Sequence, residues 1–173
     1  MAEILGEYAN DFEEVVEKTA TQLGRVYEAF NKKENRTCYL KVFEKEKLEK
    51  GDYDFLLQKI KKEEEITKLC KCENVVGFYQ KYKTDKNIIF ELEYCENNIY
   101  EAIINKYGGM DGEKSFFRKI VLDISKALKK LHDNGVMHRD IKPNNIFLNH
   151  TSEKKWGKSC QIRRFWLLYF YSG

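Results

Sequence analysis

One run of eight residues concentrates the side chains that can do chemistry. It consists of His138-Arg139-Asp140-Ile141-Lys142-Pro143-Asn144-Asn145, and the apolar residues Ile146, Phe147 and Leu148 follow it. An aspartate can accept a proton, an asparagine oxygen can hold a divalent cation, and a lysine can neutralise an anion. These residue types, confined to one short loop, could support proton transfer next to a bound anionic group.

The spacing of this run matches the pattern H-R-D-x-x-x-x-N, and on these residues the chain resembles the eukaryotic-type serine/threonine protein kinases. The resemblance implies that Asp140 accepts the proton of a substrate hydroxyl and that Asn145 holds Mg²⁺ on the phosphates of ATP. Lys142 would neutralise the transferring phosphate, as in family members that act on serine and threonine. ATP and Mg²⁺ are the expected cofactors, and a protein serine or threonine is the expected substrate.

A second set of residues begins with Tyr39-Leu40-Lys41-Val42, which resembles the V-A-I-K strand of the same family. In that family the lysine bridges the nucleotide phosphates to a glutamate on the following helix. Glu63 is preferred to Glu64 and Glu65 because only Glu63 shares the apolar face of the predicted helix. The resemblance therefore predicts an ion pair between Lys41 and Glu63.

The glycine-rich phosphate loop of the family is only partly present. Aligning Gly24 and Val26 with the end of the pattern G-x-G-x-x-G-x-V places Thr19 and Thr21 where two further glycines belong. Glycines let backbone N–H groups approach phosphate without a Cβ in the way. The resemblance assigns Gly24 and Val26 to nucleotide binding, and the two threonines predict poorer phosphate contacts.

The segment from Ile88 to Cys95 resembles the hinge of the family. Leu92 would be the gatekeeper, and the backbone groups of Glu93 and Cys95 would hydrogen-bond adenine. An ordinary buried strand is the alternative interpretation, because backbone groups leave no signature in a sequence. The hinge assignment therefore depends on the resemblance alone.

A sheet and several helices must position these residues. Short apolar runs between Val15 and Phe43 predict three antiparallel strands, and two more are predicted at 75–82 and 88–94. Helices are predicted at 52–70, 99–105 and 113–134. The last helix has an apolar stripe made of Phe117, Ile120, Val121, Ile124, Ala127, Leu128 and Leu131, and Gly135 is placed to end it.

The predicted fold class is α+β, with a kinase-like five-stranded antiparallel small lobe carrying one helix and an incomplete helical large lobe. The predicted organisation is an N-terminal extension at 1–14, a small lobe at 15–94, a partial large lobe at 95–150 and an aberrant tail at 151–173. The resemblance ends near Leu148, because neither a D-F-G nor an A-P-E motif follows. A chain that lacks the rest of the large lobe is expected to expose the stripe of its last helix and to fold poorly.

The tail suggests a frameshift. Codons can be chosen for residues 161–167 that, translated one base later, encode Lys-Phe-Ala-Asp-Phe-Gly, which contains the missing D-F-G. The aspartate depends on that codon choice, whereas Trp166 followed by a leucine codon forces the glycine. A membrane anchor is the competing interpretation, but the apolar run at 165–171 is far shorter than the roughly 20 residues that span a bilayer.

Composition narrows the class of protein. The 173 residues are 42% hydrophobic and 34% charged, and the net charge of +3 comes from interspersed acidic and basic residues, so no nucleic-acid partner is indicated. Five cysteines form neither a zinc pattern nor a disulfide framework. With no signal peptide at the N-terminus, a cytoplasmic or nuclear protein without membrane contact is expected. The oligomeric state is left open.

Two functions remain in competition. By resemblance, the chain is an ATP-dependent serine/threonine kinase, and the missing D-F-G predicts impaired phosphoryl transfer. The alternative is a non-catalytic, pseudokinase-like fragment that binds or regulates another kinase. The intact run from His138 to Asn145 argues against this alternative, because a binding module needs neither the base nor the metal ligand.

Overall fold

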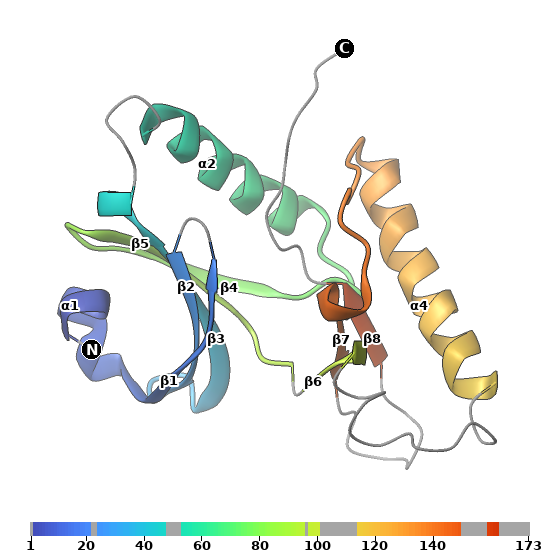
Figure 1. Cartoon of the computed structure of the whole chain (residues 1–173), viewed down its shortest axis with the longest axis horizontal. Coiled ribbons are helices and arrows are strands. Elements are labelled where there is room, and N and C mark those ends of the chain that lie inside the picture. The colour runs from blue at the N-terminus through green and yellow to red at the C-terminus, as the bar shows by residue number, and fades with distance from the viewer. Residues whose placement is uncertain are drawn as a thin grey trace. The chain divides into compact units, whose positions relative to one another are not determined.

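A five-stranded antiparallel sheet carries the first group of candidate residues (Figure 1). The structure is a computed structural model, and it describes residues 2–21, 24–47, 53–95, 97–100, 114–149 and 159–162. The strand order is β1-β2-β3-β5-β4, and every neighbouring pair is antiparallel. The strands are β1 (Phe12–Thr21), β2 (Gly24–Asn31), β3 (Arg36–Glu44), β4 (Phe78–Lys83) and β5 (Asn87–Glu93). The predicted α+β class and five-stranded sheet are confirmed.

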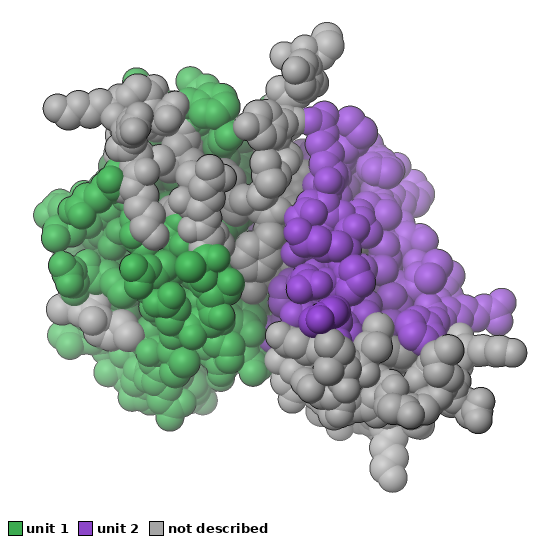
Figure 2. All heavy atoms as spheres, in the orientation of Figure 1, with its two compact units in different colours: residues 1–64, 77–94 green, residues 65–76, 95–173 purple. Residues whose placement is uncertain are grey.

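The chain divides into two compact units, residues 1–64 with 77–94 and residues 65–76 with 95–173 (Figure 2). The first unit contains the sheet, α1 (Ala2–Leu5) and the 3₁₀ turns η1 (Gly6–Asp11) and η2 (Lys45–Lys47). The helix α2 (Tyr53–Leu69) begins in the first unit and ends in the second. The second unit also contains β6 (Asn97–Asn98), α4 (Lys114–Asp133), η3 (Pro143–Asn145), β7 (Ile146–Asn149) and β8 (Ser159–Ile162). The first unit ends at residue 94, and residues 65–76 group with the second unit.

Both faces of the central strand β3 are buried. On one face, Leu40 and Val42 form an apolar cluster with Ile89 of β5 and Leu5 of α1. On the other face, the rings of Phe43 and Phe90 meet edge to face with centroids 5.1 Å apart. Successive side chains of a strand point to opposite faces, so Lys41 lies on the Phe43 face, opposite the apolar cluster.

The N-terminal segment is part of the first unit rather than an extension from it. Leu5 is 1% exposed within the apolar cluster, and the side-chain amide of Asn87 donates to the Ile4 carbonyl oxygen at 2.8 Å. β1 begins at Phe12, three residues before the predicted start at Val15. The reason is tertiary, because the Phe12 ring packs edge to face on Tyr82 of β4.

The helix α4 lies where it was predicted, but only part of its predicted apolar stripe is buried. Ile120, Ala127 and Leu131 are buried, whereas Val121 is 61% exposed. Asp123 is buried instead and forms an ion pair with Lys119 at 2.8 Å. The buried stripe is narrower than predicted. Its members Ile120, Asp123, Ala127 and Leu131 are three or four positions apart, and residues at this spacing point to the same side of the helix.

Gly135 ends α4 as predicted. It adopts a left-handed φ of +69°, and its N–H donates to the His132 carbonyl oxygen at 2.9 Å. The Val136 N–H donates to the Leu131 carbonyl oxygen, also at 2.9 Å. These two bonds form a Schellman motif, which satisfies carbonyl groups that the helix leaves without intrahelical donors.

Several predicted boundaries are shifted. The fourth strand was predicted at 75–82 and lies at Phe78–Lys83, because Val75 closes a turn by donating to Cys72. The fifth strand and α2 differ by one residue at each end. Most of the helix predicted at 99–105 lies outside the described residues.

Within the tail at 151–173, the structure contains a strand that the sequence analysis did not predict. Residues 159–162 form β8, which pairs antiparallel with β7 in the three-stranded sheet β6-β7-β8. The remaining residues of the tail, including the apolar run, lie outside the described residues.

Candidate active-site residues

The first group of candidate residues centres on Lys41 of β3. Its ammonium Nζ lies 2.7 Å from Oε1 of Glu63 on α2, and the two residues are 2% and 7% exposed. The predicted ion pair is confirmed. Glu64 instead pairs with Lys81 of β4, and Glu65 points to solvent, so the helical phase inferred from the apolar face is correct.

Val26 shares the face of Lys41. The two residues are direct partners in the β2–β3 register, and Val26 is 1% exposed. Side chains that face each other across paired strands lie on the same side of the sheet. Val26 therefore provides a buried apolar surface next to the Lys41–Glu63 ion pair.

Gly24 has a structural reason to be glycine. A Cβ on this residue would lie 1.8 Å from the Val42 carbonyl oxygen, which is far inside van der Waals contact. Its pairing with Thr21 continues the β1–β2 ladder to the hairpin, whose residues 22–23 lie outside the described residues. This close approach of two strands requires glycine whether or not a phosphate binds, and a phosphate contact of Gly24 stays a prediction.

The predicted hinge residues lie at the end of β5. Leu92 is buried and is the register partner of Tyr39, so its side chain is on the Lys41 face of the sheet. Glu93 makes two bonds with Gly77: its N–H donates to the Gly77 carbonyl oxygen at 2.8 Å, and its Oε2 accepts from the Gly77 N–H at 2.9 Å. The buried Cys95 belongs to the second unit. The adenine contacts of these residues stay predictions.

The second group of candidate residues meets at the carboxylate of Asp140. Asn145 donates from Nδ2 to Oδ2 of Asp140 at 2.7 Å and to its carbonyl oxygen at 2.9 Å. The Lys142 ammonium lies 3.0 Å from the same Oδ2. The three predicted catalytic residues are therefore in mutual contact. Both bonds use the nitrogen of the Asn145 side-chain amide. The amide oxygen, which is the atom that can bind a cation, takes no part in them.

The loop around Asp140 is held by its own backbone. Arg139 adopts a left-handed φ of +63°, and the Asp140 N–H donates to Nδ1 of the buried His138 at 3.3 Å. Pro143 then opens the turn η3, in which the Asn145 N–H bonds the Lys142 carbonyl oxygen at 2.9 Å. A non-glycine residue with positive φ is uncommon, and Arg139 shares this conformation with Glu14 and Asn35 among the described residues.

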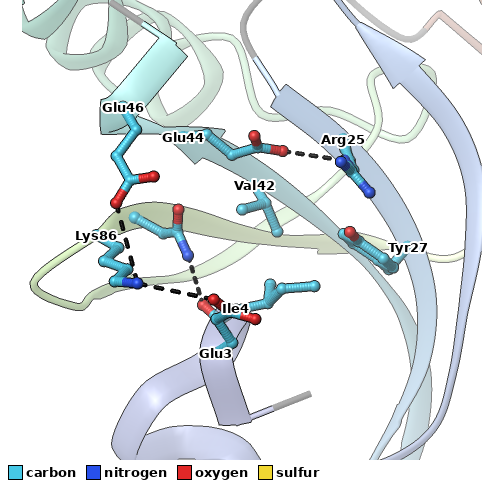
Figure 3. A pocket seen from close by; sticks show the side chains of 9 residues that line it. Glu3, Ile4, Arg25, Tyr27, Val42, Glu44, Glu46 and Lys86 are labelled. Carbon is cyan, nitrogen blue, oxygen red and sulfur yellow. Dashed lines mark hydrogen bonds and ion pairs between the residues drawn. The ribbon is translucent and has the colours of Figure 1, made fainter.

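A pocket of about 290 Å³ lies beside α1 (Figure 3). Its walls include Ile4, Tyr27 of β2 and Val42 of β3. Tyr27 and Val42 alternate along their strands with Val26 and Lys41, so the pocket is on the opposite face of the sheet. It is therefore separate from the predicted nucleotide-binding residues.

Sequence reasoning missed one group of buried polar residues in the first unit. Glu91 of β5 is fully buried and bonds Asn31, Arg36 and Tyr82. A charged residue inside the apolar run 88–92 was the available signal.

In the described part of the chain, no cluster of three or more His, Cys, Asp and Glu side chains could hold a metal ion. Within those same residues, no helix combines the length and apolarity that a membrane crossing needs.

Comparison with known proteins gives matches to one family. The family model described as protein kinase domain matches residues 21–163. A CBL-interacting protein kinase 28 from Oryza sativa subsp. japonica is 29% identical over 133 residues, which are 76% of this chain and 29% of the relative. A CBL-interacting serine/threonine-protein kinase 12 from Arabidopsis thaliana is 31% identical over 155 residues, which are 86% of this chain and 30% of the relative. The chain thus spans less than a third of these relatives.

Proposed function

Since this chain belongs to the protein kinase family, we propose that its two groups of residues serve phosphoryl transfer from MgATP to a serine or threonine of a protein. Its relatives among known proteins include serine/threonine kinases. The observation that carries the proposal is the contact of Asn145 and Lys142 with the Asp140 carboxylate. Phosphoryl transfer depends mainly on positioning and on neutralising charge, and these three side chains supply a base, a cation and an amide oxygen within one loop.

Each residue of the loop has a role in this proposal. Asp140 accepts the proton of the substrate hydroxyl, and its bond from Asn145 fixes the orientation of the carboxylate. Lys142 stabilises negative charge that develops on the transferring group. The oxygen of Asn145 would hold Mg²⁺, and MgATP when bound supplies the phosphoryl group.

The first unit would hold the nucleotide. Lys41 would bind the α- and β-phosphates while Glu63 fixes its ammonium. Val26 and Leu92, both buried on the Lys41 face, would contact the adenine, with the backbone of Glu93 and Cys95 as hydrogen-bond partners. The Glu93 N–H is already bonded to the Gly77 carbonyl oxygen within the first unit.

The residues present fit MgATP in part. The Lys41 ammonium, fixed by Glu63 at 2.7 Å, has the charge that phosphate binding needs. Thr19 and Thr21 occupy positions where the family pattern has glycine, and the second metal-binding aspartate of the family is not found among the described residues. We therefore propose weak nucleotide binding by this chain and slow transfer.

The experiment measures two quantities on the 173-residue chain, the Kd of MgATP by calorimetry and the transfer of radiolabelled γ-phosphate to a generic protein substrate. Asp140→Asn should lower the transfer rate about 10²–10⁴-fold, the usual effect of losing a general base, and should change the Kd little. Lys41→Met should weaken MgATP binding instead. Equal transfer by the parent and the Asp140→Asn variant would contradict the assignment.

A non-catalytic regulatory module is the second candidate, and Thr19 and Thr21 in the phosphate-loop positions favour it. The same experiment separates the two functions. Binding of MgATP without any transfer above background would favour the regulatory module over the kinase.

A further inference from the structure

Glu91 is the most deeply buried charged residue of the first unit. It lies on β5 with 0% of its surface exposed. Its carboxylate accepts bonds from Nη2 and Nε of Arg36 at 2.8 and 3.2 Å and from the Tyr82 hydroxyl at 2.6 Å. The side-chain amide of Asn31 lies 3.2 Å from both carboxylate oxygens. One side chain thus links β5 to β2, β3 and β4.

Stability alone does not explain this arrangement. Moving the Glu91 carboxylate out of water costs several kcal/mol, and the Arg36 side chain that pairs with it is itself 30% exposed. Burial and the hydrogen bond to Glu91 raise the pKa of Tyr82, so its hydroxyl remains a donor to the carboxylate at ordinary pH. The best-attested role of such buried ionic groups is to fix one register among several.

The register of β5 decides which of its side chains lie on the Lys41 face of the sheet. Phe90 is the partner of Lys41 and Leu92 the partner of Tyr39, so these side chains share the Lys41 face, whereas Glu91 points to the other face. A slip by one residue would exchange the two faces of the strand. It would bring Glu91 to the Lys41 face and remove Leu92 from it.

β4 is irregular at the same place. Phe78 pairs with Leu92 and Gln80 with Glu91, so Tyr79 is an extra residue in a bulge. The Arg36 guanidinium lies 3.8 Å from the centroid of the Tyr79 ring. Arg36 therefore contacts both the bulge and Glu91. Bulges re-aim side chains and are frequent next to functional sites.

We infer that Glu91 is a positioning residue, which together with Arg36 fixes the register of β5 so that Leu92 stays on the Lys41 face, where the base of a bound nucleotide would lie. This inference rests on the proposed function. Glu91 contacts neither nucleotide nor substrate and acts through the strand. Two hydrogen bonds join Glu93 to Gly77, two residues further along β5 than Glu91. Because they form only in this register, the protection of the Glu93 amide hydrogen measures the register without any ligand.

The test uses the double variant Arg36→Met/Glu91→Leu of the 173-residue chain, which replaces both partners of the ion pair by apolar side chains. Its Tm should fall, because the buried Asn31 amide and Tyr82 hydroxyl lose their carboxylate acceptor, so binding is measured well below the Tm of the variant. Under those conditions the Kd of MgATP should rise about tenfold or more, equivalent to about 1.4 kcal/mol. Exchange of the Glu93 amide hydrogen should accelerate about tenfold or more.

Two controls make the result decisive. Lys33→Ala removes an exposed ion pair with Asp11 near the same β2–β3 turn and should leave the Kd and the Glu93 exchange unchanged. If the double variant does not fold, Glu91→Gln decides, because it keeps the side-chain shape but presents an amide donor to Arg36. It should also raise the Kd and accelerate the exchange.

The outcomes separate this inference from the proposed function. A folded double variant with the Kd and Glu93 exchange of the parent would overturn the positioning role and leave Glu91 as packing only. If the parent does not bind MgATP, the proposed function fails, and the exchange at Glu93 in the variants still decides whether Glu91 fixes the register.

Discussion

At the scale of single residues, two ion pairs of the first unit that involve buried carboxylates differ in what surrounds them. Lys41 and Glu63 meet at 2.7 Å on the face that would bind a nucleotide. Glu91 and Arg36 meet at 2.8 Å on the opposite face, inside a set of hydrogen bonds from three strands. The first pair is the one that we propose binds the nucleotide phosphates, whereas the second has its carboxylate bonded within the protein.

The free energy of unfolding should respond strongly to Glu63. Glu63→Leu removes the carboxylate 2.7 Å from a buried ammonium and should cost about 3–5 kcal/mol. Lys41→Met/Glu63→Leu should recover most of that loss, because no buried charge is left uncompensated. Urea unfolding measures both values. Glu65→Gln, on the exposed side of α2, is the control, and a Glu63→Leu effect as small as this control would refute the burial argument.

At the scale of elements, glycine has two different roles at Gly24 and Gly135. A Cβ at Gly24 would meet the Val42 carbonyl oxygen, whereas a Cβ at Gly135 would have no heavy atom within 4 Å. Gly135 is glycine because its φ of +69° is strained for other residues. Steric exclusion therefore acts at the hairpin of the sheet and conformational strain at the end of α4.

These roles predict different costs for the same substitution. Gly135→Ala should destabilise by about 1–2 kcal/mol, the cost of a left-handed residue. Gly24→Ala should cost more, because β2 and β3 must separate to admit the methyl group. Comparing the two variants by urea unfolding checks the order, and a Gly24→Ala cost equal to or below that of Gly135→Ala would show that the strands separate easily.

The sheet should also lose stability at alkaline pH. Burial, aided by the charge of Glu91, raises the pKa of the Cys38 thiol to about 12 from its ordinary value near 9. Between these values the unfolded chain releases the proton while the folded chain keeps it. The free energy of unfolding therefore falls as pH rises above about 9.

The measurement compares the parent with Cys38→Ala by urea unfolding at pH 7, 9, 10 and 11. Lysines and tyrosines also titrate in this range, so the difference in slope between the two proteins is the informative quantity. The slope should be shallower in the variant. Parallel curves would mean that the Cys38 thiol ionises equally in both states.

At the scale of the whole molecule, the first unit includes the N-terminal segment in addition to the five-stranded sheet. The segment 2–11 precedes the residues that the family model matches, yet it supplies Leu5 to the main apolar cluster. The Lys32 N–H bonds the Asp11 carbonyl oxygen at 2.9 Å, and Asn87 bonds Ile4, so the segment is anchored at both ends. The second unit has its own cluster, formed by Ile66, Cys70, Leu131 and Val136.

This anchoring predicts that the N-terminal segment contributes to folding. Leu5→Ala should lower the free energy of unfolding by about 2–5 kcal/mol, as for other buried leucines. Val16→Ala, at a 57% exposed position of β1, should change it by less than about 0.5 kcal/mol. Thermal and urea unfolding give both values. Equal effects of the two substitutions would mean that the segment does not contribute to the core in solution.

The sequence by itself determined the features that depend on short spacings. The order of residues in the loop from His138 to Asn145, the helical phase that selects Glu63, and the glycine that ends α4 all follow from neighbours within about a helical turn or two. Local geometry fixes such features, because the relevant atoms are held together by the backbone. The structure agrees with the predicted choice of Glu63 as the partner of Lys41 and with the predicted helix end at Gly135.

Only the tertiary structure decided the features that join distant residues. Asn31 and Glu91 are 60 positions apart, and Ile4 and Asn87 are 83 apart. No periodicity links such pairs, so neither the partners of Glu91 nor the docking of the N-terminal segment could be predicted. The pairing of β8 with β7 and the exposure of Val121 were missed for the same reason. In each case the free energy comes from contacts that exist only after the chain has folded, when burial and strand pairing select among conformations that the local sequence allows equally.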